Sequence, residues 1–139
     1  MVGIEHSKHS DIPEAISALP VTKDRNQLLK LYNAADIVLN LSYEESFGLT
    51  TVEGLACGTP SIVYNCTASP ELVSPETGFI VEPRNIQGLI DSIAKIEENG
   101  KSYYSEACRK RAEEHFDKDK CFEKYIELYE SLINASVSD

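Results

Sequence analysis

The sequence lacks several features that would point to common classes of function. It has no apolar run long enough to span a bilayer, and no basic segment followed by an apolar one at its start. Basic residues are scarce, since 13 Lys and Arg stand against 23 Asp and Glu, a formal net charge of −10. Such a charge disfavours a nucleic-acid backbone or an anionic membrane as a partner. We therefore expect no nucleic-acid partner.

The four cysteines lack the Cys-x-x-Cys spacing of zinc and redox sites; they are Cys57, Cys66, Cys108 and Cys121. In a secreted protein this even count would allow two disulfides. Free, buried thiols in a reducing cytoplasm are the alternative that compartment usage favours, so we expect a cytoplasmic protein. The sequence also lacks a Gly-x-Ser-x-Gly motif, internal repeats and low-complexity segments.

Two patterns could suggest a metal site, and neither supplies enough ligands. His6 and His9 have no cysteine or carboxylate in register. Asp117 and Asp119 form an Asp-x-Asp triplet, but a divalent cation needs further oxygen ligands. The triplet precedes a predicted helix, where Asp is a preferred capping residue. We predict no metal and no cofactor.

The 139 residues, 42% of them hydrophobic, suffice for one domain with its own core. Strands and helices alternate in the hydrophobic pattern, which predicts an α/β fold: a Rossmann-like parallel sheet with flanking helices. The predicted strands span residues 15–19, 36–41, 60–64 and 78–81. The predicted helices span residues 24–35, 49–57, 85–98, 101–116 and 119–132, with a short helical turn near residue 70 and a frayed tail from residue 133. Thr22 or Asp24 can cap the first helix, whose apolar stripe includes Tyr32, and Gly58 with Pro60 can end the second. The apolar positions of the last helix are Phe122, Tyr125, Ile126, Leu128, Tyr129 and Leu132. We treat 1–139 as a single domain, with 1–98 as its α/β part and 101–139 as C-terminal helices.

The stretch from Tyr43 to Pro60 carries the residues that point most directly to a ligand-binding site. A near-continuous apolar run leads into a loop with Glu45 and Gly48, and a helix with Glu53 follows. Parallel sheets bind ligands beyond the carboxyl ends of their strands, and a helix N-terminus attracts phosphate. Gly48 has no Cβ and would let the backbone approach such a ligand.

Glu45 and Glu53, eight residues apart, can flank a bound ligand. Carboxylates accept hydrogen bonds from pairs of sugar hydroxyls, so phosphate between two such acids describes a nucleotide sugar. The simpler alternatives are a solvated loop acid for Glu45 and, for Glu53, an acid placed favourably near the positive end of a helix.

These residues carry a family resemblance. Glu45-Ser-Phe-Gly-Leu-Thr-Thr-Val-Glu53, followed by Gly-Leu-Ala-Cys-Gly-Thr-Pro, resembles the E-x7-E signature of retaining nucleotide-sugar glycosyltransferases of the family 4 type. Those enzymes have the two-domain GT-B fold, and this chain resembles the donor-binding part of its C-terminal domain. Segment 31–38 resembles "LYxxADxxV", and segments 69–73 and 76–81 resemble "PElv" and "xtGxlv". The match runs in order over nearly the whole chain.

The resemblance implies a role for each site residue. Glu45 would be catalytic, contacting the donor sugar near its anomeric centre, and Glu53 would bind the ribose. Backbone N–H groups of the intervening residues would hold the diphosphate, with the Thr50 hydroxyl in addition. The implied substrate-binding residues are Glu45, Ser46, Phe47, Gly48, Leu49, Thr50 and Glu53. Pro20, Val21 and Thr22 would lie against the base, although an ordinary βα loop explains them equally.

The implied reaction is transfer of a sugar from a nucleoside-diphosphate donor to a saccharide or lipid-linked acceptor, with retention and without metal. Family habit places it in surface or capsular polysaccharide synthesis and allows a peripheral location at the inner membrane face. Two alternatives remain: a sugar-nucleotide epimerase of related fold, and a non-catalytic α/β binding module.

The resemblance also implies that parts are missing. Residues 1–4 resemble the end of a strand in the middle of the family's C-terminal domain, so we expect a fragment. The acceptor-binding domain and the Arg/Lys pair that neutralises the departing diphosphate would precede it. Since such charge stabilisation is a major part of catalysis, this chain alone should be inactive. Where many members carry Gly-Gly, this chain has residues 66–69, Cys-Thr-Ala-Ser, which leaves the donor sugar open.

Overall fold

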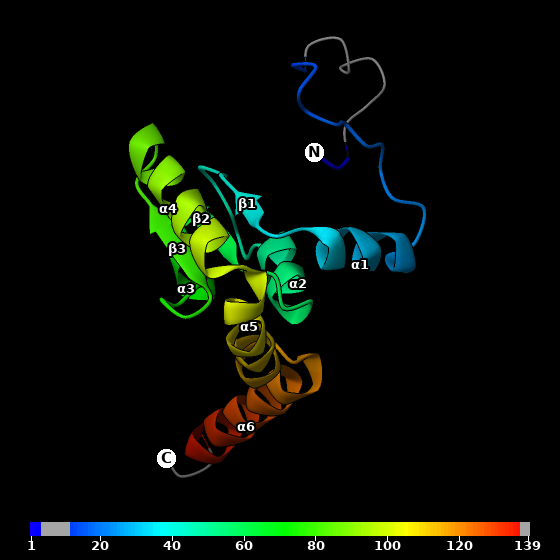
Figure 1. Cartoon of the computed structure of the whole chain (residues 1–139). Helices are drawn as coiled ribbons and strands as arrows, with labels where there is room; N and C mark the ends of the chain where they lie inside the picture. Colours follow the sequence, from blue (N-terminus) through cyan, green and yellow to red (C-terminus); the bar gives the residue numbers. More distant parts are fainter. Residues whose placement is uncertain (4–11, 137–139) are drawn as a thin grey trace.

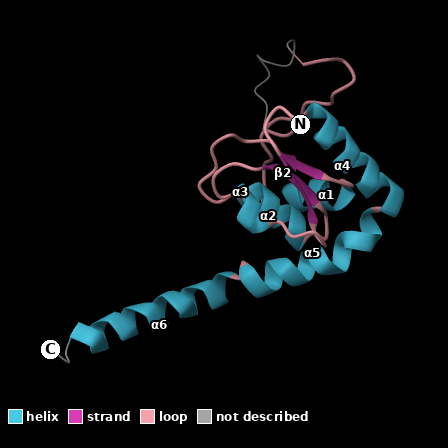
Figure 2. Ribbon diagram, turned by 90° about the vertical axis from the view of Figure 1, so that its left-hand side faces the viewer, coloured by secondary structure: helices cyan, strands magenta, loops and turns pink. Residues whose placement is uncertain are grey.

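The structure, a computed structural model, describes residues 1–3 and 12–136 (Figure 1). His6 and His9 lie outside the described residues, as do residues 137–139. The elements in chain order are α1 (Arg25–Ala34), β1 (Val38–Asn40), α2 (Leu49–Ala56), β2 (Ser61–Tyr64), α3 (Ser69–Leu72), β3 (Gly78–Val81), α4 (Ile86–Asn99), α5 (Lys101–His115) and α6 (Lys118–Ser136). They form an α/β body from which α6 projects (Figure 2).

In the part of the chain that the structure describes, three strands form a parallel sheet in the order β1-β2-β3. All four residues of the central strand β2 are buried, as expected for a strand that is paired on both sides. Helix α2 contacts β1 and β2, and α4 contacts β2 and β3. The predicted α/β fold with a parallel sheet and flanking helices is confirmed.

The first predicted strand, residues 15–19, is wrong. Among the described residues it forms only an isolated bridge, in which Leu19 pairs with Val2 and donates its N–H to Met1 O at 2.8 Å. Leu19 and Ile16 remain 38% and 42% exposed, because no sheet packs against this segment in the part of the chain described. A short apolar run is not enough for a strand when no neighbour buries it.

The second predicted strand is shorter than its apolar run. Residues 36–41 predict a strand buried on both faces, but β1 covers only Val38–Asn40 and leaves Leu39 48% exposed. Within the described residues β1 pairs with β2 alone, so it is an edge strand. Its burial is correspondingly incomplete.

The helix ends agree well with the sequence signals. Of the two candidate caps, Thr22 and Asp24, it is Asp24 that caps α1, by accepting the Gln27 N–H at 2.9 Å. Gly58 ends α2 in the left-handed region at φ +72°, and its N–H donates to Leu55 O while Thr59 N–H donates to Gly54 O. These two bonds form a Schellman motif, so the predicted glycine stop is confirmed.

Helix α5 shares the core of the sheet. Its buried face contributes Tyr104, Cys108 and Ala112 to one cluster with Leu55 and Ile62. All four cysteines are free thiols, as expected, but only Cys108 is buried, so the expected burial is wrong for the other three. Residues 101–115 therefore pack as part of the α/β body rather than beside it.

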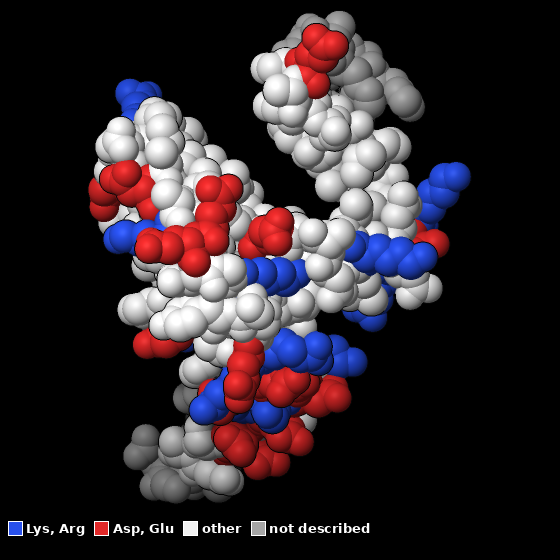
Figure 3. All heavy atoms as spheres, in the orientation of Figure 1, with Lys and Arg blue, Asp and Glu red and all other residues white. Residues whose placement is uncertain are grey.

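Helix α6 is longer than predicted, and its apolar side is exposed. It continues through Ser136, so the expected fraying from residue 133 is wrong for the described residues. Its predicted apolar positions are 51–60% exposed; they are Phe122, Tyr125, Ile126, Leu128, Tyr129 and Leu132. Figure 3 shows acidic and basic side chains interspersed over α5 and α6. Among the described helices, α6 included, none is long and apolar enough to cross a membrane.

The buried Cys108 thiol should make the fold sensitive to alkaline pH. Burial raises its pKa from 9.0 to about 12. The unfolded thiol loses its proton near pH 9 while the folded one keeps it, so the free energy of unfolding should fall between pH 9 and 12, by at most about 1.4 kcal/mol per pH unit. Urea unfolding at pH 8 and pH 10 should show this loss in the wild type and a smaller loss in Cys108→Ala. Cys57→Ala, at a less buried thiol, should keep most of the fall in the free energy of unfolding between pH 8 and pH 10. An equal fall in the two variants would show that Cys108 is not its cause.

Candidate functional site

Most of the predicted site residues lie in the loop from β1 to α2 and in the first turns of α2, beyond the carboxyl end of β1. Gly48 is the N-cap residue of α2. The Thr51 N–H donates to Gly48 O at 3.0 Å, so the preceding N–H groups of Leu49 and Thr50 have no partner within the helix. A phosphate placed beyond β1 would meet these groups and the positive end of the helix.

Gly48 has a structural reason to be glycine. Its φ is +92°, and an added Cβ would lie 2.6 Å from Leu72 Cδ1 and 3.4 Å from Glu45 Cγ. The sequence suggests a ligand in the space left by the missing Cβ. The structure instead fills that space with protein side chains.

Glu45 is held by Asn40, at the end of β1, and by Thr67, in the loop that follows β2. Its N–H donates to the Thr67 hydroxyl at 2.9 Å, and its carboxylate accepts from Asn40 Nδ2 at 3.4 Å. The Asn40 side chain is buried, donates also to Thr51 Oγ1 at 3.2 Å, and accepts from the Ser42 hydroxyl at 2.8 Å. Ser42 and Thr51 therefore orient the amide that reaches Glu45.

Glu53 is held by a hydrogen bond from a side chain of α1. The Tyr32 hydroxyl donates to Glu53 Oε2 at 3.0 Å. Burial, and then the neighbouring Glu53 carboxylate, hold the pKa of Tyr32 well above its usual value, so the phenol remains a donor. Lys101 caps the C-terminal end of α1. Its Nζ donates to the carbonyls of Tyr32, Asn33 and Ala35 at 3.3, 2.8 and 2.8 Å.

One cavity of about 590 Å³ brings several predicted residues together. It is lined by Thr50 and Glu53 from α2, by Tyr32 from α1, and by Val21 and Thr22 from the segment before α1. The volume lies in the usual range of small-molecule pockets. Residues expected to meet the base, phosphate and ribose of a nucleotide thus face one space.

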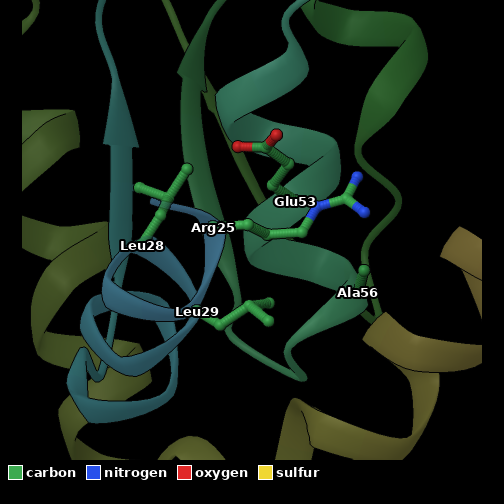
Figure 4. A pocket seen from close by; sticks show the side chains of 5 residues that line it. All are labelled: Arg25, Leu28, Leu29, Glu53 and Ala56. Atoms are coloured by element: carbon green, nitrogen blue, oxygen red, sulfur yellow. The ribbon is translucent and has the colours of Figure 1, made fainter. Parts of the chain in front are cut away.

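Glu53 also borders a second hollow, of about 270 Å³, between α1 and α2. Figure 4 shows its five lining side chains, with Arg25 extending from α1 toward α2. The Glu53 carboxylate is therefore reachable from two adjoining spaces.

Ser46 and Phe47 lie elsewhere. They line a separate hollow of about 270 Å³ with Arg111 and His115 of α5, and the Phe47 ring packs edge-on against Phe116 at 6.0 Å between centroids. Glu45 lines none of these three spaces, nor do Pro20, Gly48 and Leu49, the last of which is 64% exposed. The predicted residues thus divide between two separate spaces, and four of them line neither.

Sequence reasoning missed three residues that hold the two acids. The sequence pattern places Tyr32 in the apolar stripe of α1, although a tyrosine there carries a hydroxyl that needs a partner. Asn40 is a polar residue inside an apolar run, which is the signal that could have found it. Thr67 gives no such signal, because its contact with Glu45 spans 22 residues.

The described residues offer no cluster of three His, Cys, Asp or Glu side chains that could hold a metal ion. In the Asp-x-Asp triplet, Asp117 accepts the Lys120 N–H at 3.0 Å, which confirms its predicted use in capping α6.

Known proteins match this chain in sequence. The family model described as "Glycosyl transferases group 1" covers residues 5–115. The D-inositol 3-phosphate glycosyltransferase of Mycolicibacterium smegmatis is 37% identical over 86 residues, covering 61% of this chain and 20% of that protein. The N-acetyl-alpha-D-glucosaminyl L-malate synthase of Bacillus anthracis is 28% identical over 112 residues, covering 78% and 29%.

Solved structures match the fold. Sucrose-phosphate synthase from Thermosynechococcus elongatus superposes with a TM-score of 0.76 at 25% identity, covering 92% of this chain and 33% of that one. Anabaena HepE in complex with UDP gives 0.70 at 25% identity, covering 83% and 32%. This chain thus spans only a fifth to a third of the proteins it matches, and its fold is that of part of a GT-B glycosyltransferase. Since the family model covers most of its length, the chain belongs to the group 1 glycosyl transferases.

Proposed function

We propose that this chain forms the donor half-site of a retaining, metal-independent glycosyltransferase of the family 4 type. The parent protein would transfer a sugar from a nucleoside-diphosphate donor to a saccharide or lipid-linked acceptor. The observation that carries the proposal is the cavity of about 590 Å³ that Val21, Thr22, Thr50 and Glu53 share. Family membership supports it, as does the solved relative that holds UDP.

Each part of the donor has a matching group. Val21 and Thr22 would border the base, and the N–H groups of Leu49 and Thr50 would face the diphosphate. Glu53 would accept hydrogen bonds from the ribose hydroxyls. Its carboxylate has room for them beside the Tyr32 hydroxyl, because an ionised carboxylate offers about four acceptor positions.

Glu45 would contact the sugar near the reacting carbon. It lies on the loop that precedes the phosphate-facing turn, and Asn40 and Thr67 fix it there. A preorganised carboxylate at this place would stabilise positive charge that develops on the sugar. The positive side chains that balance the diphosphate, and the acceptor site, would come from the rest of the parent protein. We infer that this protein works in the cytoplasm, at the inner membrane face.

Calorimetric titration of this chain tests the proposal. UDP, GDP and ADP should differ in affinity, and the matching sugar conjugate among UDP-glucose, GDP-mannose and ADP-glucose should bind more tightly than its nucleotide. Glu45→Gln should remove this sugar preference. Glu44→Gln, at the neighbouring acid outside the motif, is the matched control and should retain it.

Failure of all three nucleotides to bind, both to this chain and to a longer protein that includes the preceding domain, would exclude the donor site. Incubating that longer protein with donor and no acceptor separates the alternative enzyme class, since an epimerase would convert the sugar nucleotide and a transferase would leave its sugar configuration unchanged.

A further inference from the structure

The loop from β2 to α3, residues 65–68, contains an unusual backbone conformation. Thr67 has φ +46°. A β-branched residue is a genuine outlier in this region, because its Cβ crowds the following carbonyl. Among the residues that the structure describes, Arg84, at φ +67°, is the only other non-glycine residue with positive φ. Such outliers persist where the surroundings require them.

The surroundings of Thr67 point to its hydroxyl. The side chain is exposed, so core packing does not account for the conformation. Its Oγ1 accepts the Glu45 N–H at 2.9 Å, across 22 residues of sequence. Two backbone hydrogen bonds shape the turn around Thr67. The Cys66 N–H donates to Tyr64 O at 2.8 Å, and the Ser69 N–H donates to Cys66 O at 3.1 Å.

The two loops are also held together by packing. The Tyr43 ring, two residues before Glu45, lies 5.5 Å from the Tyr64 ring at the end of β2, measured between centroids. The Thr67 hydroxyl therefore reaches the Glu45 backbone from a loop that already lies beside it. From the other side, Asn40 reaches the Glu45 carboxylate. The loop after β2 thus holds the Glu45 backbone, and the end of β1 holds its side chain.

We propose that Thr67 is a positioning residue for Glu45: its left-handed backbone places a hydroxyl that fixes the Glu45 backbone and so aims the Glu45 carboxylate at the donor sugar. Glycine would adopt φ +46° without strain but carries no hydroxyl. A threonine at this strained φ is explained if the site requires its hydroxyl as the acceptor of the Glu45 N–H. This inference rests on the proposed function for the aim toward sugar, but not for the hydrogen bond.

Three substitutions separate the hydroxyl from the backbone conformation. Thr67→Val keeps the shape and β-branching and removes the hydroxyl. Thr67→Ser keeps the hydroxyl and relieves crowding. Thr67→Gly relieves the backbone strain and removes the hydroxyl. Arg84→Gly is the matched control, since it relieves the same kind of conformation in the turn before α4.

The first measurement is amide hydrogen exchange by NMR on the unliganded chain. The Glu45 amide should exchange at least tenfold faster in Thr67→Val and Thr67→Gly, and at the wild-type rate in Thr67→Ser and Arg84→Gly. An unchanged Glu45 rate in both Thr67→Val and Thr67→Gly would overturn the proposal. This readout needs no ligand, so it stands whatever the chain binds.

The second measurement is the sugar preference, defined as the Kd of a nucleotide divided by the Kd of its sugar conjugate. The pairs compared are UDP with UDP-glucose, GDP with GDP-mannose, and ADP with ADP-glucose. Thr67→Gly should reduce the sugar preference about tenfold while its Tm stays at or above the wild-type value, and Thr67→Ser should retain the preference. A merely structural role would change the Tm and leave the ratio unchanged, which would overturn positioning. A wild type without any sugar preference would overturn the proposed function and the aim toward sugar, while the exchange rates would still decide the hydrogen bond.

Discussion

Replacing Gly78 with alanine is expected to lower the free energy of unfolding by more than about 4 kcal/mol, or to prevent folding. Gly78 is buried at the start of β3 with φ +152° and pairs with Ser61 of β2. An added Cβ would lie 1.8 Å from Ser61 O and 2.8 and 2.9 Å from the Ser61 C and N atoms. All three are backbone atoms of the central strand, so relief requires β2 and β3 to separate.

Thermal and urea unfolding of Gly78→Ala measure this loss, with Gly100→Ala as the matched control. Gly100 also has positive φ, at +77°, but the nearest atom to an added Cβ is Ser102 Oγ at 4.0 Å. Gly100→Ala should therefore lose only the backbone preference, about 1–2 kcal/mol. Similar losses in the two variants would show that the contact with Ser61 is not the cause.

Replacing Glu53 with alanine is expected to weaken nucleoside-diphosphate binding about 10- to 100-fold, the loss of charge-assisted hydrogen bonds to the ribose. The effect should depend on the ribose hydroxyls. A 2′,3′-dideoxynucleoside diphosphate should bind the wild type weakly and lose little more in Glu53→Ala. Titration of both nucleotides into both proteins gives this double comparison.

Tyr32→Phe gives the intermediate case. It keeps Glu53 and removes the hydroxyl that donates to Oε2 at 3.0 Å, so nucleotide affinity should fall only several-fold. If Glu53→Ala weakened the dideoxynucleotide as much as the ribonucleotide, Glu53 would not act through the ribose. Circular dichroism of each variant would show whether a loss reflects unfolding instead.

Local signals in the sequence predicted the site segment well. The apolar run before Glu45, the glycine stop at Gly58 and the cap at Asp24 each depend on residues close in sequence. They determine where helices begin and end. The order of strand, loop and helix around Glu45 and Glu53 could therefore be predicted from the residues alone.

The errors concern burial, which depends on neighbours distant in sequence. The segment ending at Leu19 and the exposed Leu39 have apolar patterns typical of strands, but pairing decides whether such residues are buried. The predicted apolar positions of α6 are more than half exposed among the described residues, Tyr125 at 59%, so the pattern marks an apolar side that the fold does not bury.

The supports of the two acids could not be predicted for a related reason. Tyr32 reaches Glu53 across 21 residues, and Thr67 reaches Glu45 across 22. Each contact depends on the placement of a second loop or helix that the sequence pattern does not position. The motif acids are visible in sequence, whereas the groups that orient them become visible only in the fold.

The projection of α6 has a consequence for how the chain behaves in a column or a scattering experiment. A helix of 19 residues is about 28 Å long, roughly twice the radius of gyration of about 14 Å expected for a compact domain of this length. An elongated particle has a larger hydrodynamic radius than its mass indicates. An elution volume judged against globular standards would overstate the mass of this chain, and a monomer could be mistaken for a dimer.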